Sequence, residues 1–106
     1  MDTKKYNGWT NYETWLVNLW FDDSFNDDAQ QCFDDAEADN TFTRAERATL
    51  NLADVIKDTV EEMNPIASQA SLWSDMVNGA LSEVNWYEIA EHYIVKVGTL
   101  TEGGMR

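Results

Sequence analysis

The apolar positions near the start of the chain follow the period of an amphipathic helix. Five aromatic and aliphatic residues fall at i, i+3, i+4, i+7 and i+8: Tyr12, Trp15, Leu16, Leu19 and Trp20. This spacing places them on one helix face. Thr10 precedes this stripe, and Glu13 lies within its first turn. The two residues are three positions apart, which is the spacing of a capping box. The pattern predicts a first helix with Thr10 as its N-cap.

The same reasoning predicts two more helices in the middle of the chain. The second covers about residues 26–38, and Ser24 with Asp27 repeats the capping pattern at its start. The third is the longest and begins with a box made of Thr43 and Glu46. It ends before Pro65, because proline lacks an N–H group and disfavours a helical residue before it.

Two helices are expected in the last third. Leucine, tryptophan and methionine at helical spacing indicate one over about residues 66–84. Asn85 caps the next, with Glu88 at its third position, and Gly98 is a typical C-terminal stop. Residues 93–100 alternate briefly, so a short strand is the alternative there.

These elements predict an all-α protein, a compact irregular bundle of about five short helices. At 106 residues the chain has the size of one domain, so residues 1–106 are expected to share one core. Residues 1–8 and 99–106 lack periodicity and are expected to be a flexible arm and a flexible tail.

Charge narrows the possible partners. Twenty acidic residues against seven basic ones give a net charge of -13. Phosphate groups are bound by clustered Lys and Arg, so neither nucleic acid nor an anionic membrane surface is expected as a direct ligand. A basic protein is the expected partner, bound by a monomer or a homodimer. The single cysteine, Cys32, has no disulfide partner in the chain, which favours the cytoplasm of a host cell.

The chain has few of the side chains that catalysis requires, so we expect neither enzymatic activity nor a cofactor. The chain has one imidazole, His92, and one thiol, Cys32, which lies on the apolar side of its predicted helix. His92 follows Glu88 by four residues, the spacing of an ordinary surface pair. Oxygen donors alternate from Asp22, but Asp27 stands where a calcium loop needs Gly, so no metal site is expected.

The acidic residues gather in one part of the sequence. No Lys or Arg occurs between Tyr6 and Thr43. At 100° per residue, Asp27, Asp28, Asp34, Asp35 and Asp39 fall on one side of the predicted second helix. Along the helix axis, Asp27, Asp28, Asp34 and Asp35 place one negative charge per roughly 3 Å. The phosphates of a DNA strand have a similar spacing, roughly 3.4 Å. The candidate partner-binding residues are Asp22, Asp23, Asp27, Asp28, Asp34, Asp35 and Asp39, extended by Asp54, Asp58, Glu61 and Glu62.

This density suggests a DNA mimic that inhibits a host nucleic-acid-handling protein. The alternative is that the acids only cover the solvated side of an amphipathic helix. A non-enzymatic structural or regulatory interaction module is the second functional hypothesis. It uses an aromatic surface, because five side chains cannot all point inward in so small a bundle: Trp9, Trp20, Phe21, Trp73 and Trp86. The alternative is that these aromatic residues form a tryptophan-rich core whose edges are partly exposed.

Two stretches carry a family resemblance: G-W-T-N-Y-E-T-W at Gly8–Trp15 and N-W-Y-E-I-A-E-H at Asn85–His92. Together they resemble a family of small, largely uncharacterised proteins of phages, plasmids and other mobile elements. The resemblance implies a mobile-element origin and carries over no catalytic residue. By analogy with small acidic proteins of such elements, it favours an inhibitor of host defence of the anti-restriction or anti-CRISPR type. Both motifs also suit a structural role as helix starts.

Overall fold

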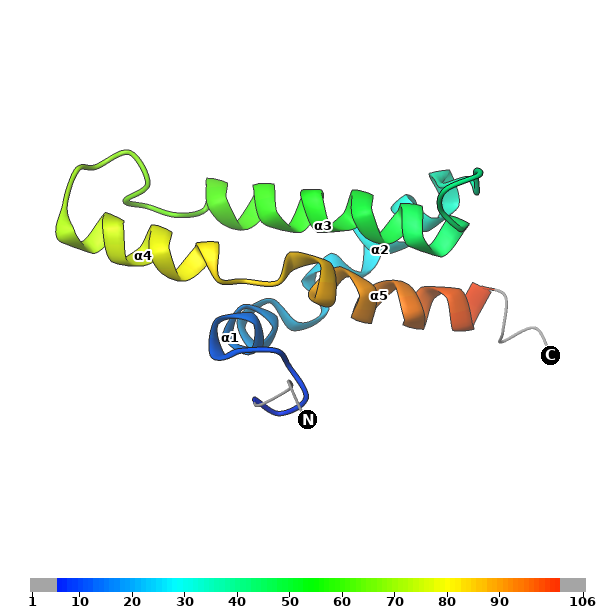
Figure 1. Ribbon diagram of the computed structural model, residues 1–106, viewed down its shortest axis with the longest axis horizontal. Coiled ribbons are helices and arrows are strands. Elements are labelled where there is room, and N and C mark those ends of the chain that lie inside the picture. The colour runs from blue at the N-terminus through cyan, green and yellow to red at the C-terminus, as the bar shows by residue number, and fades with distance from the viewer. Residues whose placement is uncertain (1–5, 102–106) are drawn as a thin grey trace.

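The helices expected from the sequence are present in a computed structural model, which describes the backbone of residues 6–101 and the side chains of residues 6–98. This range contains five α-helices and one 3-10 helix; Figure 1 shows how the α-helices are arranged. Their bounds are α1 Tyr12–Phe21, η1 Asp22–Phe25, α2 Asn26–Asp35, α3 Arg44–Glu62, α4 Leu72–Ser82 and α5 Trp86–Thr101. The predicted all-α bundle of about five short helices is confirmed.

Two of the predicted helix starts are confirmed in detail. At the start of α3, the Thr43 hydroxyl accepts a hydrogen bond from the Glu46 N–H at 3.1 Å, and the Glu46 carboxylate accepts one from the Thr43 N–H at 2.8 Å. At the start of α5, the Asn85 side chain accepts from the Glu88 N–H at 3.0 Å. These caps depend only on neighbouring residues, which is why a local pattern finds them.

The other two predicted N-caps are wrong. Asn11, not Thr10, caps α1, because its side chain accepts from the Thr14 N–H at 2.9 Å. No side chain caps α2, since the chain enters it already coiled through η1, and Ser24 lies inside that 3-10 turn. Helix α2 is also shorter than predicted, because the backbone becomes extended at Ala36, with ψ 146°.

The predicted bounds of the last two helices also need correction. Helix α4 begins at Leu72 rather than near residue 66, because Ser71 and Ser74 form a capping box and residues 63–69 form turns. Helix α5 continues through Gly98 to Thr101, so the strand alternative for residues 93–100 is wrong. At the N-terminal side, Tyr6 pairs with Trp9 in an isolated antiparallel bridge. The remainder of the predicted arm and tail, residues 1–5 and 102–106, lies outside the described residues.

The hydrophobic core lies where α2, α3 and α5 meet. Helices α3 and α5 run side by side, and α2 packs against both (Figure 1). Leu52, Ile56 and Ile89 are fully buried at this junction. Helix α4 contributes no buried hydrophobic residue and has no extensive packing surface with another described helix. It extends from one end of a molecule that measures 52 × 33 × 27 Å.

Candidate partner-binding surfaces

The four aspartates of α2 are all exposed. Asp27 and Asp28 lie in the first turn of the helix, and Asp34 and Asp35 in its last. The opposite side of α2 buries Ala29 and Phe33 in the core. Asp34 accepts a hydrogen bond from Gln30 and Asp35 one from Gln31, each at 2.9 Å. The amphipathic arrangement predicted for these four carboxylates is therefore present.

Asp39 does not belong to this helix face, which corrects its predicted place. It lies in the loop after α2, where one carboxylate oxygen accepts from the N–H groups of Thr41 and Phe42, each at 2.8 Å. The other oxygen is 2.8 Å from a guanidinium nitrogen of Arg47. The Phe42 N–H, the Arg47 side chain and the Thr41 N–H together lower the pKa of Asp39 to about 2. Asp39 shapes the loop that leads into α3.

Bases from outside the acidic stretch reach back to it, so the absence of Lys and Arg from residues 6–43 does not mean that the stretch lacks compensating charge. Arg44 donates to the Phe33 carbonyl at 3.0 Å, and its guanidinium stacks over the Phe33 ring at 4.1 Å. Lys96 of α5 lies 4.0 Å from the exposed carboxylate of Asp23. Asp22 is also exposed, and its carbonyl accepts from the buried Tyr93 hydroxyl.

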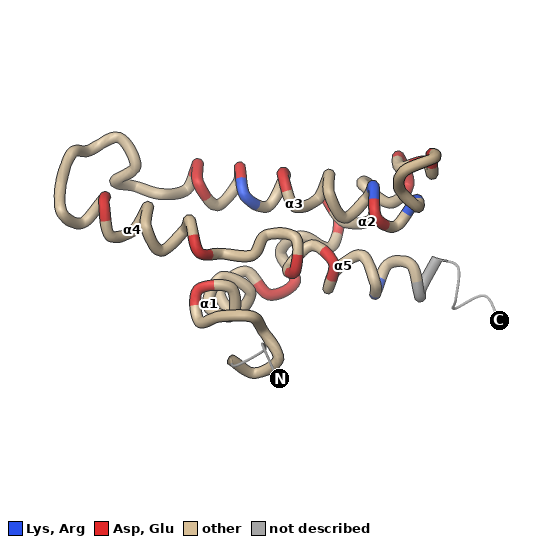
Figure 2. Tube along the Cα trace, viewed as in Figure 1, with Lys and Arg blue, Asp and Glu red and all other residues tan. Residues whose placement is uncertain are grey.

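The carboxylates of α3 form a separate group. Asp54, Asp58, Glu61 and Glu62 are all exposed, as the sequence predicts. However, α2 lies beside the first half of α3, and Glu61 and Glu62 are at the other end (Figure 2). Lys57 lies among these acids along α3. The acidic residues of α3 therefore do not continue the acidic side of α2 as the sequence suggested, because they extend toward the other end of α3.

Cys32 is half-buried on the inner side of α2. Burial raises the pKa of its thiol, and the charges of Asp28 and Asp35 raise it further. A thiol held protonated is a poor nucleophile. The position fits the structural role predicted for this residue.

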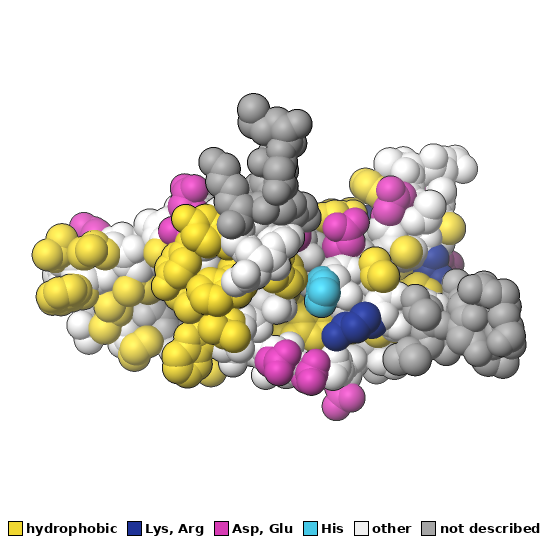
Figure 3. Space-filling view, turned by 90° about the horizontal axis from the view of Figure 1, so that it is seen from below, with side chains coloured by type: hydrophobic (Ala, Val, Ile, Leu, Met, Phe, Trp, Pro, Cys, Tyr) yellow, Lys and Arg dark blue, Asp and Glu magenta, His cyan; other side chains and the backbone are white. Residues whose placement is uncertain are grey.

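Large exposed hydrophobic side chains gather toward the end of the molecule that is away from α2, on α1, on α4 and after α3 (Figure 3). The most exposed large side chains of α1 and α4 are Trp20 and Trp73, at 78% and 67% of their full areas. Figure 3 shows hydrophobic side chains gathered over this end. We call the exposed set the apolar surface: Leu19, Trp20, Met63, Leu72, Trp73 and Met76. Of the five aromatic residues expected on a surface, Trp20 and Trp73 are exposed, whereas Trp9, Phe21 and Trp86 pack against the core.

Beside this surface lies an open pocket of about 660 Å³. It is bounded by the end of α1, the end of α3 with its following turn, and the inner side of α4. Its lining contains no charged side chain: Trp20, Phe21, Val60, Met63, Asn64, Pro65, Ile66, Val77 and Leu81. Sequence reasoning missed Met63, Leu72 and Met76 as surface residues, although residues 63–82, in which Asp75 is the only charged side chain, were a signal that could have found them.

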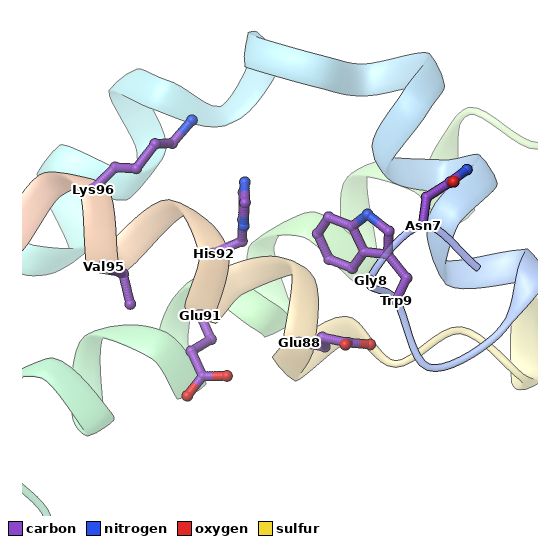
Figure 4. Close-up of a pocket in the computed structure, with 8 residues that line it drawn as sticks. All are labelled: Asn7, Gly8, Trp9, Glu88, Glu91, His92, Val95 and Lys96. Atoms are coloured by element: carbon purple, nitrogen blue, oxygen red, sulfur yellow. The ribbon is translucent and has the colours of Figure 1, made fainter. Parts of the chain in front are cut away.

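A second pocket, of about 410 Å³, lies beside the only histidine. The His92 and Trp9 rings are 5.2 Å apart. Figure 4 shows that Glu91 and Val95 point away from the side on which His92 and Lys96 lie, so these groups do not converge. Within residues 6–98, no three His, Cys, Asp or Glu side chains are grouped closely enough to hold a metal ion. No described helix is long and apolar enough to cross a membrane.

The two sequence motifs meet in one polar network between the starts of α1 and α5. The Asn11 side chain accepts from the Thr14 hydroxyl at 2.6 Å and donates to the Glu83 carbonyl at 2.7 Å. The Thr14 hydroxyl in turn accepts from the Asn85 N–H at 2.9 Å. Glu88, only 7% exposed, accepts from the Thr10 N–H at 3.1 Å. The motifs thus hold two helices together that lie about 70 residues apart in the sequence.

Comparisons with known proteins place the chain in a family. Neither the curated proteins nor the solved structures contain a match to the chain. One family model does match, over residues 2–94, a span that includes both motifs. Since this span covers most of the 106 residues, the chain belongs to the family of unknown function DUF7249.

Proposed function

We propose that this protein is a cytoplasmic, non-enzymatic binding protein of a mobile element. It inhibits a basic host protein that handles nucleic acid by offering the acidic side of α2 in place of DNA. The observation that carries the proposal is the exposure to solvent of Asp27, Asp28, Asp34 and Asp35 on one side of a short helix. Carboxylates at this spacing can displace counterions from a basic groove as phosphates do.

A comparison of two variants with equal charge tests this proposal. The first replaces Asp27, Asp28, Asp34 and Asp35 by Asn, and the matched control replaces Asp54, Asp58, Glu61 and Glu62 by Asn or Gln. Each tagged protein is used to capture proteins from host lysate, which are identified by mass spectrometry. We expect a DNA- or RNA-binding protein to be retained by the wild type and by the control, and to be lost with the α2 variant and at high salt.

We expect the variant with four substitutions in α2 to remain folded, so a loss of the partner can be assigned to the lost charges. Asp34 and Asp35 oppose the dipole at the C-terminal end of α2, while Asp27 and Asp28 favour it at the N-terminal end. The changes therefore nearly cancel, and we expect the free energy of unfolding to stay within about 1 kcal/mol. Retention of the same partner by the folded α2 variant would refute the acidic surface as the binding site.

The second candidate is a structural or regulatory interaction module that uses the apolar surface. It is favoured by the exposure of Trp20 and Trp73, at 78% and 67%. Apolar surface that is contiguous and exposed commonly marks a protein interface. Salt distinguishes the two candidates, because screening weakens an electrostatic interface and leaves an apolar one intact.

A further inference from the structure

Helix α4 has little support from its own chain. Its outward side exposes Leu72, Trp73 and Met76 at 66%, 67% and 57%. An isolated helix of 11 residues is marginal in water, because helices shorter than about 12–15 residues gain too little to offset nucleation. Leu81, near the end of α4, packs against the core, and an apolar surface laid against the outward side would add to that contact.

The scarcity of charged residues in and around α4 indicates which kind of surface would pack on it. In a protein with a net charge of -13, residues 64–74 contain no charged side chain, and Asp75 is the only one in α4. Glu13 is the only one in α1. Depletion of charge is typical of interface cores, and homodimer interfaces are the most apolar. A basic partner finds only Glu13 and Asp75 as opposite charges on these two helices.

The surface combines protruding side chains with a hollow. Trp73 and Met76 protrude at the same end of the molecule as the uncharged pocket of about 660 Å³. An isologous interface uses the same patch on both copies, so a second copy would bring its own protruding side chains to this end. Trp20 and Trp73 together expose roughly 220–360 Å², taking about 150–250 Å² for a whole aromatic side chain. That is a large share of the roughly 800 Å² that each partner contributes to a standard interface.

We propose that the apolar surface binds a second copy of this chain, with α4 and the end of α1 forming a two-fold interface. Figure 1 places α4 and α2 toward opposite ends of the long axis, so the acidic α2 helices of the two copies stay apart and remain free. This inference deepens the second candidate function, and it does not depend on the acidic-surface proposal.

Sedimentation velocity of the full chain tests the dimer, over concentrations from low micromolar to millimolar and at low and high salt. We expect a concentration-dependent dimer that becomes tighter at high salt, because screening reduces the repulsion between two copies of charge -13. Partner binding through α2 has the opposite salt dependence, so the two proposals can fail separately. A chain that stays monomeric at every concentration would overturn the dimer and leave the surface to another protein.

Variants locate the interface. Trp73→Ser and Met76→Glu alter exposed positions of α4, and each is expected to weaken the dimer at least about tenfold. Val95→Ser is the matched control, since Val95 is 61% exposed but lies on α5. Far-ultraviolet circular dichroism checks that each variant keeps its helices. A dimer unchanged by both α4 variants, or weakened equally by the control, contradicts the proposed surface.

Discussion

At the scale of single residues, the least expected feature is a buried polar network. Thr14 is fully buried, although a sequence pattern only marks it as a polar position between aromatic ones. Its hydroxyl donates to Asn11 and accepts from the Asn85 N–H, so both of its hydrogen-bonding roles are filled. A buried polar group is costly unless it is satisfied, which explains why several residues of both motifs are needed at once.

We expect Thr14→Val to destabilise the protein by about 1–3 kcal/mol, because the Asn85 N–H loses its acceptor at a part-buried position. The measurement is the free energy of unfolding in urea. Thr49→Val is the matched control: Thr49 is also buried, but its hydroxyl donates only to the Ala45 carbonyl of its own helix, at 2.7 Å. Equal losses for the two variants would argue against a stabilising link between α1 and α5.

At the scale of elements, the sequence located some local helix ends and missed others that are equally local, such as the Ser71–Ser74 box at the start of α4. The box of Thr43 and Glu46 is local and is confirmed. Gly98 was expected to stop α5, but a stop of this kind needs a left-handed glycine. In the structure Gly98 is helical and lies against Phe33 of α2, and Gly8 is the glycine with a positive φ, of 92°, among the described residues.

Substitution of the two glycines should therefore have opposite effects. Gly98→Ala is expected to stabilise the protein by about 0.5–1 kcal/mol, because alanine is the better helix former and the added Cβ would lie 4.0 Å from the Phe33 ring, an ordinary contact. Gly8→Ala is expected to cost about 1–2 kcal/mol through its positive φ. Thermal unfolding gives both values, and a destabilised Gly98→Ala protein would contradict a helix that continues through this position.

At the scale of the whole molecule, the acidic helix α2 and the apolar surface lie toward opposite ends of the long axis (Figure 1). The acidic α2 lies beside the first half of α3, and α4, whose only charged residue is Asp75, lies beyond the last turn of α3 (Figures 1 and 2). The radius of gyration is 15.3 Å, above the roughly 13 Å typical of 100 residues, in keeping with the extension of α4 from the core. The two candidate surfaces can therefore be occupied at the same time.

Hydrogen exchange should reveal this division. In dilute solution we expect the amides of α4 to exchange much faster than those around Ile56 and Ile94, because α4 opens without disrupting the core. Raising the protein concentration should slow exchange in α4 selectively if a second copy covers it. Amides of α4 that are as protected as the core in dilute solution would show that the helix needs no partner.

The sequence alone determined the all-α class, the start of α3 and the start of α5, because helical period and caps involve residues within four positions of each other. It also indicated which α2 aspartates face solvent, since the opposite side had to be apolar. The pairing of Asp39 with Arg47 and the return of Arg44 to Phe33 were not predictable, because they depend on how α3 leaves the preceding loop.

Only the tertiary structure decided which aromatic residues are exposed. Gly8 and Thr10 flank Trp9, and Leu19 and Phe21 flank Trp20, yet Trp9 packs against the core and Trp20 lies open to solvent. The difference follows from the direction in which α4 leaves the bundle and from the end of α1 that faces it. Burial depends on contacts between segments far apart in the chain, and no local period carries that information.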